Sequence, residues 1–169
     1  MGIRFNNISM EADDIFQVLS DLNIAYEKQE HKAIFCEKDG LDVVITLSGI
    51  GVKNLFLKDK DNNYALVSMY KHQRADLKKI ADILGFGRLS FCNAEELKTF
   101  LNITPGSVTP LCLMFDTEKK VKVLFDKAFE GQNVVIHPLR NTASISISFS
   151  DLTRFVEHFN HSWMTGVFY

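Results

Sequence analysis

The order in which helical and extended patterns follow one another limits what this chain can fold into more than any single motif does. Apolar side chains recur at helical spacing in several segments, and short β-branched or aromatic runs lie between them. The expected helices cover residues 11–22, 75–84, 93–101 and 151–159. The expected strands lie around residues 24–26 and over 42–47, 53–58, 64–69, 120–125, 133–136 and 143–149.

These elements lack the regular strand–helix alternation of a doubly wound parallel sheet, and their order predicts an α+β fold with a mixed sheet. The turn signal Asp61-Asn62-Asn63 predicts an antiparallel hairpin of residues 53–58 and 64–69. In residues 143–149 apolar side chains alternate with serines, so one face of that strand should be apolar and the other lined with hydroxyls. No linker interrupts the chain, so residues 1–169 are expected to form a single domain.

Capping residues mark the ends of three of the helices. Gly85 should end the helix over residues 75–84. Asn93 and Glu96 have the spacing of a capping box and should start the next helix. Ser150 is the predicted N-cap of the last one.

Charge is distributed unevenly along the 169 residues, although the net charge is only −2. Residues 1–50 hold four basic and nine acidic side chains, which gives −5. Residues 51–92 hold eight basic and four acidic ones, and this +4 is compatible with a local phosphate-binding face or with a solvated helix surface. The apolar runs are far shorter than the ~20 residues that cross a bilayer, and the first residues lack an apolar signal segment. The sequence therefore predicts a cytoplasmic protein with no membrane partner.

Cysteines and histidines give no sign of a metal or redox site. Cys36, Cys92 and Cys112 are an odd number at wide spacing and are expected to act as small buried hydrophobic residues. The histidines form no H-E-x-x-H motif, and the chain has neither a G-x-G-x-x-G nor a P-loop sequence. No metal and no cofactor are expected.

Two loops combine special backbone residues with polar ones. In the first, Pro105 and Pro110 restrict a loop around Gly106, so its N–H groups can be held ready for an oxyanion or a carbonyl group. In the second, His137 stands before Pro138 at the end of a predicted strand, where proline favours extended geometry and limits the direction of the ring. Each loop alone is also compatible with a purely structural role.

These two loops occur in order with Lys53-Asn54-Leu55-Phe56-Leu57-Lys58-Asp59. Further stretches of the same set are residues 30–33, 88–91, 123–126 and 137–142. Together they resemble the YbaK/ProX-type aminoacyl-tRNA editing domains, within them the free-standing prolyl-tRNA editing proteins, over about residues 15–160. The resemblance implies a mixed, mostly antiparallel sheet curled into a barrel-like core and flanked by helices. It also implies hydrolysis of the ester between tRNA for proline and a wrong amino acid, alanine first of all.

The resemblance assigns site residues as well. Lys53 matches the family's lysine at the tRNA 3′ end, Gly106 and Pro110 match its G-x-x-x-P loop, and His137-Pro138 match the end of its G-H-P motif, with Ile136 in place of the glycine. Lys53, Gly106 and His137 are therefore the predicted catalytic residues. The predicted substrate-binding residues are Asn54, Ser107, Val108, Thr109, Pro110, Pro138 and Asn141.

The resemblance makes tRNA the expected partner and prolyl-tRNA synthetase a second candidate, whereas DNA is not expected. Two other classes of function stay open. One is a non-catalytic module of the same fold that binds tRNA or the synthetase, which Ile136 favours. The other is a regulator that binds a free amino acid in the same pocket. A deacylation assay with mischarged tRNAs separates these alternatives.

Overall fold

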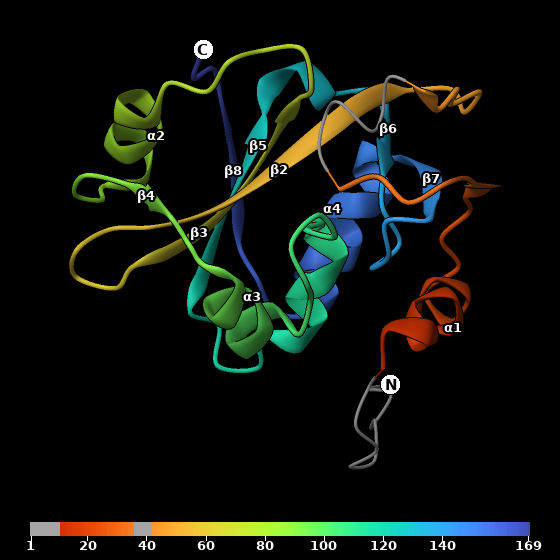
Figure 1. The fold of residues 1–169 in the computed structure, drawn as a ribbon, viewed down its shortest axis with the longest axis horizontal. Helices are drawn as coiled ribbons and strands as arrows, with labels where there is room; N and C mark the ends of the chain where they lie inside the picture. The colour runs from red at the N-terminus through yellow and green to blue at the C-terminus, as the bar shows by residue number, and fades with distance from the viewer. Residues whose placement is uncertain (1–10, 36–41) are drawn as a thin grey trace.

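The computed structural model describes residues 11–35 and 42–169, and one mixed sheet lies at its centre (Figure 1). The helices are α1 (Ile15–Asp21), α2 (Leu77–Leu84), α3 (Ala94–Leu101) and α4 (Phe149–His158), with 3-10 helices η1 (Ala12–Asp14), η3 (Pro110–Phe115) and η4 (Lys127–Phe129). The strands are β1 (Glu27–Glu30), β2 (Ile50–Lys58), β3 (Tyr64–Tyr70), β4 (Ser90–Phe91), β5 (Val121–Asp126), β6 (Asn133–Ile136), β7 (Ala143–Ser148) and β8 (Trp163–Gly166). The predicted α+β class is confirmed.

The sheet runs in the order β1-β7-β6-β2-β3-β5-β8, and β4 pairs with β2 beside this path. Four strand pairs are antiparallel, the predicted β2–β3 hairpin among them, and three are parallel. Among the described residues, the edge strands β1 and β8 are not paired with each other. Because these two edges are not paired, the sheet is open, and Figure 1 shows that it is strongly twisted.

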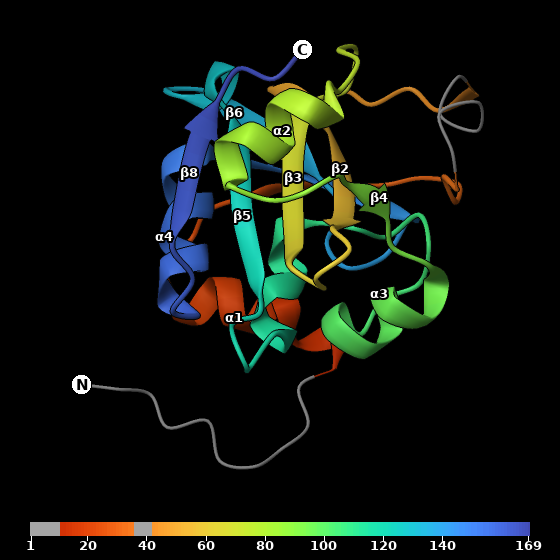
Figure 2. The same cartoon turned by 90° about the vertical axis from the view of Figure 1, so that its left-hand side faces the viewer.

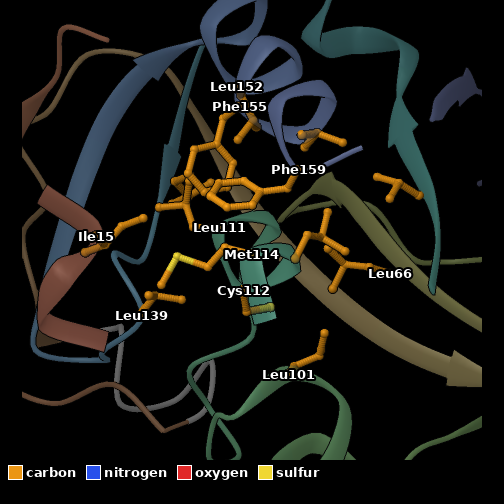
Figure 3. Close-up of a cluster of buried hydrophobic side chains, with 14 of the residues drawn as sticks. Ile15, Leu66, Leu101, Leu111, Cys112, Met114, Leu139, Leu152, Phe155 and Phe159 are labelled. Carbon is orange, nitrogen blue, oxygen red and sulfur yellow. The ribbon is translucent and has the colours of Figure 1, made fainter. Parts of the chain in front are cut away.

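Each face of the sheet is covered by its own set of helices (Figure 2). The larger core lies under α1, α3, α4 and η3, and η3 passes through its middle with Leu111 and Cys112 fully buried (Figure 3). The smaller core lies on the other face of β2, β3 and β5, under α2, where Met69, Ile80 and Phe168 are fully buried. Within the described ranges, every helix is too short or too polar to span a bilayer.

The helix ends follow the local signals with one exception. Gly85 ends α2 in the left-handed conformation with φ of +69°, and Asn93 and Glu96 form the predicted capping box of α3. The prediction of Ser150 as the last N-cap is wrong. Ser148 is the N-cap and accepts the Asp151 N–H at 3.1 Å, so α4 starts at Phe149, two residues earlier than predicted. Both serines precede the same apolar helix face, and the end of β7 decides between them.

The strand predictions failed where neighbours far along the chain decide the structure. Residues 42–47 are not a strand, because the Gln29 side chain bonds the Val44 carbonyl oxygen at 2.7 Å and the Thr46 N–H at 2.8 Å, in place of a strand ladder. The strand expected around residues 24–26 lies instead at β1. β8 was not predicted, and it forms by parallel pairing with β5.

Candidate functional site

Strands β2 and β6 are paired over a short stretch only, and the candidate site lies where they part. β6 runs parallel to β2 as far as the pair Gly51–Val135 and ends one residue later, whereas β2 continues along β3. Two residues beyond this pair are Lys53 and His137. Because residues two apart in a strand share a face, both lie on the face that carries Gly51 and Val135. The register therefore places two of the three predicted catalytic residues on one face of the sheet.

Strand β7 adds a buried hydroxyl to this row. β6 pairs with β7 through Ile136 and Ile145, so the next position along places Ser144 beside His137. Ser144 is 4% exposed, so the serine face of β7 is covered as well as its isoleucine face. The hydroxyl-lined face predicted from the sequence is thus the face of the candidate site.

His137 follows β6 directly, and one backbone bond orients its ring. Nδ1 lies 2.9 Å from the Ala143 carbonyl oxygen, so Nδ1 carries the hydrogen and donates it, which leaves the lone pair on Nε2. Burial lowers the pKa of His137 below its usual value, the bond to Ala143 opposes this, and the nearby His31 lowers the pKa further. At neutral pH the ring is uncharged, and Nε2 can accept a proton.

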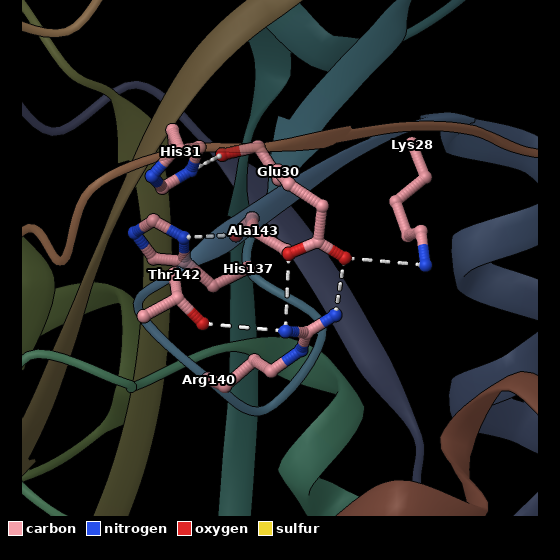
Figure 4. A network of polar contacts seen from close by, with 8 residues as sticks. Lys28, Glu30, His31, His137, Arg140, Thr142 and Ala143 are labelled. Atoms are coloured by element: carbon pink, nitrogen blue, oxygen red, sulfur yellow. Dashed lines mark hydrogen bonds and ion pairs between the residues drawn. The ribbon is translucent and has the colours of Figure 1, made fainter.

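A second imidazole, His31, lies beside His137, and the sequence analysis did not identify it (Figure 4). The two ring centroids are 6.0 Å apart. His31 Nδ1 lies 2.7 Å from the Lys32 carbonyl oxygen, and Nε2 lies 2.9 Å from the Ser144 hydroxyl. With Nδ1 donating to the carbonyl, Nε2 accepts from Ser144. His31 belongs to a stretch that carries the family resemblance, but its contact with β7 spans 113 positions and leaves no local signal.

Ion pairs hold the turn after His137 against β1 (Figure 4). The Arg140 guanidinium donates to both carboxylate oxygens of Glu30, at 2.7 and 3.1 Å, and also to the Thr142 hydroxyl at 3.3 Å. Lys28 lies 3.3 Å from the same carboxylate. The bond from Arg140 holds the pKa of the Glu30 carboxyl below its usual value. A bidentate pair of this kind fixes geometry as well as charge, and it keeps the turn in one position.

The loop over residues 104–110 turns at Gly106, whose φ of +87° lies in the region that favours glycine. The Ser107 N–H donates to the Thr104 carbonyl oxygen at 3.2 Å and is therefore already used. The N–H groups of Gly106 and Val108 have no acceptor among residues 11–35 and 42–169. This loop can therefore offer two backbone donors to a ligand.

Residues Ile34 and Phe35 bring the N-terminal segment onto this loop. A Cβ atom at Gly106 would lie 3.4 Å from both the Cα atom and the carbonyl oxygen of Phe35, an ordinary contact distance, so the positive φ and not the space favours glycine there. The Ile34 N–H donates to the Asn141 carbonyl oxygen at 3.0 Å. Segment 31–35 thus joins the turn that follows His137 to the loop of Gly106.

Asn54, a predicted substrate-binding residue, supports the Gly106 loop. Its Nδ2 donates to the Val108 carbonyl oxygen at 3.0 Å, and its Oδ1 accepts from the Ser68 hydroxyl at 2.5 Å. Asn54 is next to Lys53 in β2, so its side chain lies on the opposite face of the strand. The amide ties the loop to the strand that carries Lys53.

The remaining predicted substrate-binding residues are buried or half-buried. Ser107, Thr109, Pro110 and Pro138 are buried, whereas Val108 and Asn141 are half-buried. Thr109 is the N-cap of η3 and accepts the Leu111 N–H at 3.5 Å. Ile136, which stands in place of the family's glycine, is 3% exposed and lies in the larger core, on the face of β6 opposite His137. Its side chain therefore does not fill the site.

Among the described residues, neither a reactive thiol nor a metal cluster accompanies these groups. Burial raises the pKa values of Cys92 and Cys112 to about 12, so both are unreactive thiols, and Cys36 lies outside the described residues. Within the described ranges, no three His, Cys, Asp or Glu side chains are placed to hold a metal ion. Two shallow hollows of about 370 and 380 Å³ lie elsewhere, one next to Trp163 and one next to Phe86.

The arrangement therefore combines an uncharged imidazole, a lysine on the same face and a glycine loop with two N–H donors. The aminoacyl-tRNA editing domain matches this chain over residues 39–155. The chain belongs to this family.

Individual relatives of this editing domain cover most of the chain. The prolyl-tRNA editing protein ProX of Acetoanaerobium sticklandii is 35% identical over 141 residues, which is 82% of this chain and 86% of that protein. The prolyl-tRNA synthetase associated domain-containing protein 1 of Danio rerio is 32% identical over 152 residues, 88% of this chain and 83% of that protein. A crystal structure of a candidate trans-editing enzyme for prolyl tRNA synthetase has the same fold, with a TM-score of 0.68 at 17% identity over 94% of this chain and 98% of that one.

Proposed function

We propose that this protein is a cytoplasmic deacylase that acts in trans on mischarged tRNA for proline and removes alanine first of all. The relatives named for prolyl-tRNA editing support the tRNA and the reaction class. The observation that supports the proposal is the register of β2 and β6, which puts Lys53 on the same face of the sheet as the neutral imidazole of His137, while Asn54 ties the loop of Gly106 to the same strand.

The chemistry that an aminoacyl ester needs is modest, because the ester is already activated. The N–H groups of Gly106 and Val108 stabilise the oxyanion that develops on the carbonyl oxygen, and losing one such donor typically costs ~3 kcal/mol. His137 Nε2 accepts a hydrogen bond from the attacking water or from the ribose 2′-hydroxyl, since its Nδ1 hydrogen is already bonded. Lys53 binds the terminal ribose-phosphate as a point charge.

The preference for alanine has a physical reason. A synthetase pocket built for proline discriminates weakly against a smaller amino acid, because missing methylene groups are worth only ~1–3 kcal/mol. A second pocket that admits the small product and rejects the correct one restores accuracy. Prolyl-tRNA should therefore be a poor substrate of this protein.

A panel of tRNAs for proline, charged separately with alanine, cysteine, serine and proline, tests the proposal. We expect fastest hydrolysis of alanyl-tRNA, and a reduction of about ten-fold or more in Lys53→Ala, the size of a lost charged contact. Lys98→Ala is the matched control, since Lys98 lies on α3 and bonds Asn102 at 2.8 Å. Thermal unfolding of each variant verifies that it folds.

Two results contradict the proposal. Hydrolysis of none of these tRNAs would leave a non-catalytic module that binds tRNA or the synthetase. Unchanged turnover in Lys53→Ala would remove Lys53 from the mechanism.

A further inference from the structure

Lys71 lies beside the candidate site in a position that the fold itself defines. It follows β3 directly, and its N–H donates to the Gly51 carbonyl oxygen at 2.9 Å, which extends the β2–β3 ladder by one pair. Gly51 and Lys53 share a face of β2, two residues and therefore about 7 Å apart. Lys71 is thus one row of the sheet away from Lys53 and His137.

The side chain of Lys71 crosses over Gly51. A Cβ atom at Gly51 would lie 2.6 Å from Cδ, 2.7 Å from Cε and 3.2 Å from Nζ of Lys71. The absent side chain of Gly51 leaves the groove in which the lysine stem lies, and the stem brings the ammonium group over β2. The glycine therefore directs this charge toward the strand that carries Lys53.

Among the described residues, the charge of Lys71 has no carboxylate as an ion-pair partner. In the part of the chain that the structure describes, Lys71, His72 and Arg74 form no ion pair. The acidic groups near this end of β3 have other partners: Asp126 is fully buried and accepts the Tyr70 N–H at 3.1 Å, and Asp76 caps α2. The result is a cationic edge next to the face of Lys53.

We propose that Lys71 binds a backbone phosphate of the single-stranded 3′ end of tRNA, next to the phosphate at Lys53. The proposal rests on the proposed function and adds a second anchor for the same strand. Two lysines one sheet row apart suit neighbouring phosphates of an extended strand, and an exposed cation such as Lys71 is typical of such contacts. Lys71 contributes to tRNA binding and takes no part in the chemical step.

Binding of uncharged tRNA for proline tests this without any hydrolysis. In Lys71→Gln we expect Kd to rise about three-fold at ~0.1 M salt, and the slope of log K against log salt to become shallower by about 0.7, the value for one phosphate contact on a single strand. Lys98→Gln is the matched control with the same loss of charge. Lys98 is on α3, whose Phe100 packs on Tyr64 at 4.2 Å between ring centroids, at the other end of β3.

Gly51→Ala provides a second test that leaves the charge unchanged. The added methyl group displaces only the flexible end of Lys71, so the variant should fold. We expect Gly51→Ala to weaken tRNA binding by itself and to have no further effect in the Lys71→Gln background, because both changes remove the same contact.

The other outcomes of these binding experiments would overturn either the role of Lys71 or the proposed function. A Lys71→Gln effect no larger than that of Lys98→Gln, or additive effects of Gly51→Ala and Lys71→Gln, would overturn the assignment. Loss of binding to purified prolyl-tRNA synthetase with tRNA binding unchanged would overturn it in favour of a protein partner. Failure of hydrolysis with Lys71-dependent tRNA binding intact would overturn the proposed function alone.

Discussion

Replacing Asn54 by alanine should weaken both the fold and the reaction, because this amide connects β2 to the Gly106 loop. The variant loses the bonds to the Val108 carbonyl oxygen and the Ser68 hydroxyl. A buried polar group without a partner costs about 1–3 kcal/mol, and Ser68 is 1% exposed whereas Val108 is half-buried, so the sum is about 2–4 kcal/mol. For a domain of this size that corresponds to a decrease in Tm of roughly 5–15 °C.

The kinetic effect of Asn54→Ala follows from the same contact. A loop displaced by ~1 Å no longer aims its N–H groups at the carbonyl oxygen, and such a displacement costs up to ~100-fold in rate. Thermal unfolding and single-turnover deacylation of alanyl-tRNA measure the two effects. Lys53→Ala is the contrast, since it should reduce turnover without lowering Tm.

Ser68→Ala is the matched variant, because it removes only the hydroxyl that donates to Asn54. It should have a smaller effect than Asn54→Ala, and the double variant should be less affected than the sum of the two. If Asn54→Ala kept both its Tm and its rate, the amide would not hold the loop and the reasoning would be refuted.

Two further predictions concern the pH dependence of the rate and the C-terminal residues after β8. The rate of hydrolysis should fall in acid as the His137 ring is protonated, at a pH below the ordinary 6.5, because burial lowers the pKa of His137. His31 lowers this pKa further, so the acid limb of the pH–rate profile should move to higher pH in His31→Gln. An unmoved limb would contradict the coupling of the two rings. Phe168 is fully buried, so Phe168→Ala should lower the free energy of unfolding in urea by about 3–5 kcal/mol. Val167 is 55% exposed, so Val167→Ala should lower it by less than about 0.5 kcal/mol. Equal losses would show that the C-terminal residues do not support the smaller core.

Local signals in the sequence predicted those elements whose causes lie close together in the chain. The capping box of Asn93 and Glu96 and the left-handed Gly85 act within a few residues. β8 was not predicted because it forms by pairing with a distant strand, with Trp163 opposite Val123 of β5. Its own four residues carry no signal of that partner. The strand prediction for residues 42–47 failed for the opposite reason. Their apolar run is typical of a strand, but the Gln29 side chain bonds their backbone at Val44 and Thr46.

The candidate site divides in the same way, into residues that have a signal in the sequence and residues that have none. Lys53, Gly106 and His137 could be named because the ordered set of motifs resembles one family, and their catalytic roles stay predictions. His31 could not be identified, since its importance depends on Ser144 and His137, which only the completed sheet places nearby. The support role of Asn54 was equally invisible, because a strand pattern gives the face of a side chain and not its partner.

The two neighbouring imidazoles have a consequence for folding. His31 and Ser144 come from opposite ends of the chain, and closing so long a loop is slow, since its entropy is lost before the contacts can form. The row of groups is complete only once the segment after β1 packs on β7. Recovery of ester hydrolysis after dilution from denaturant would therefore report the last step of refolding, later than signals from the β2–β3 hairpin or from α2.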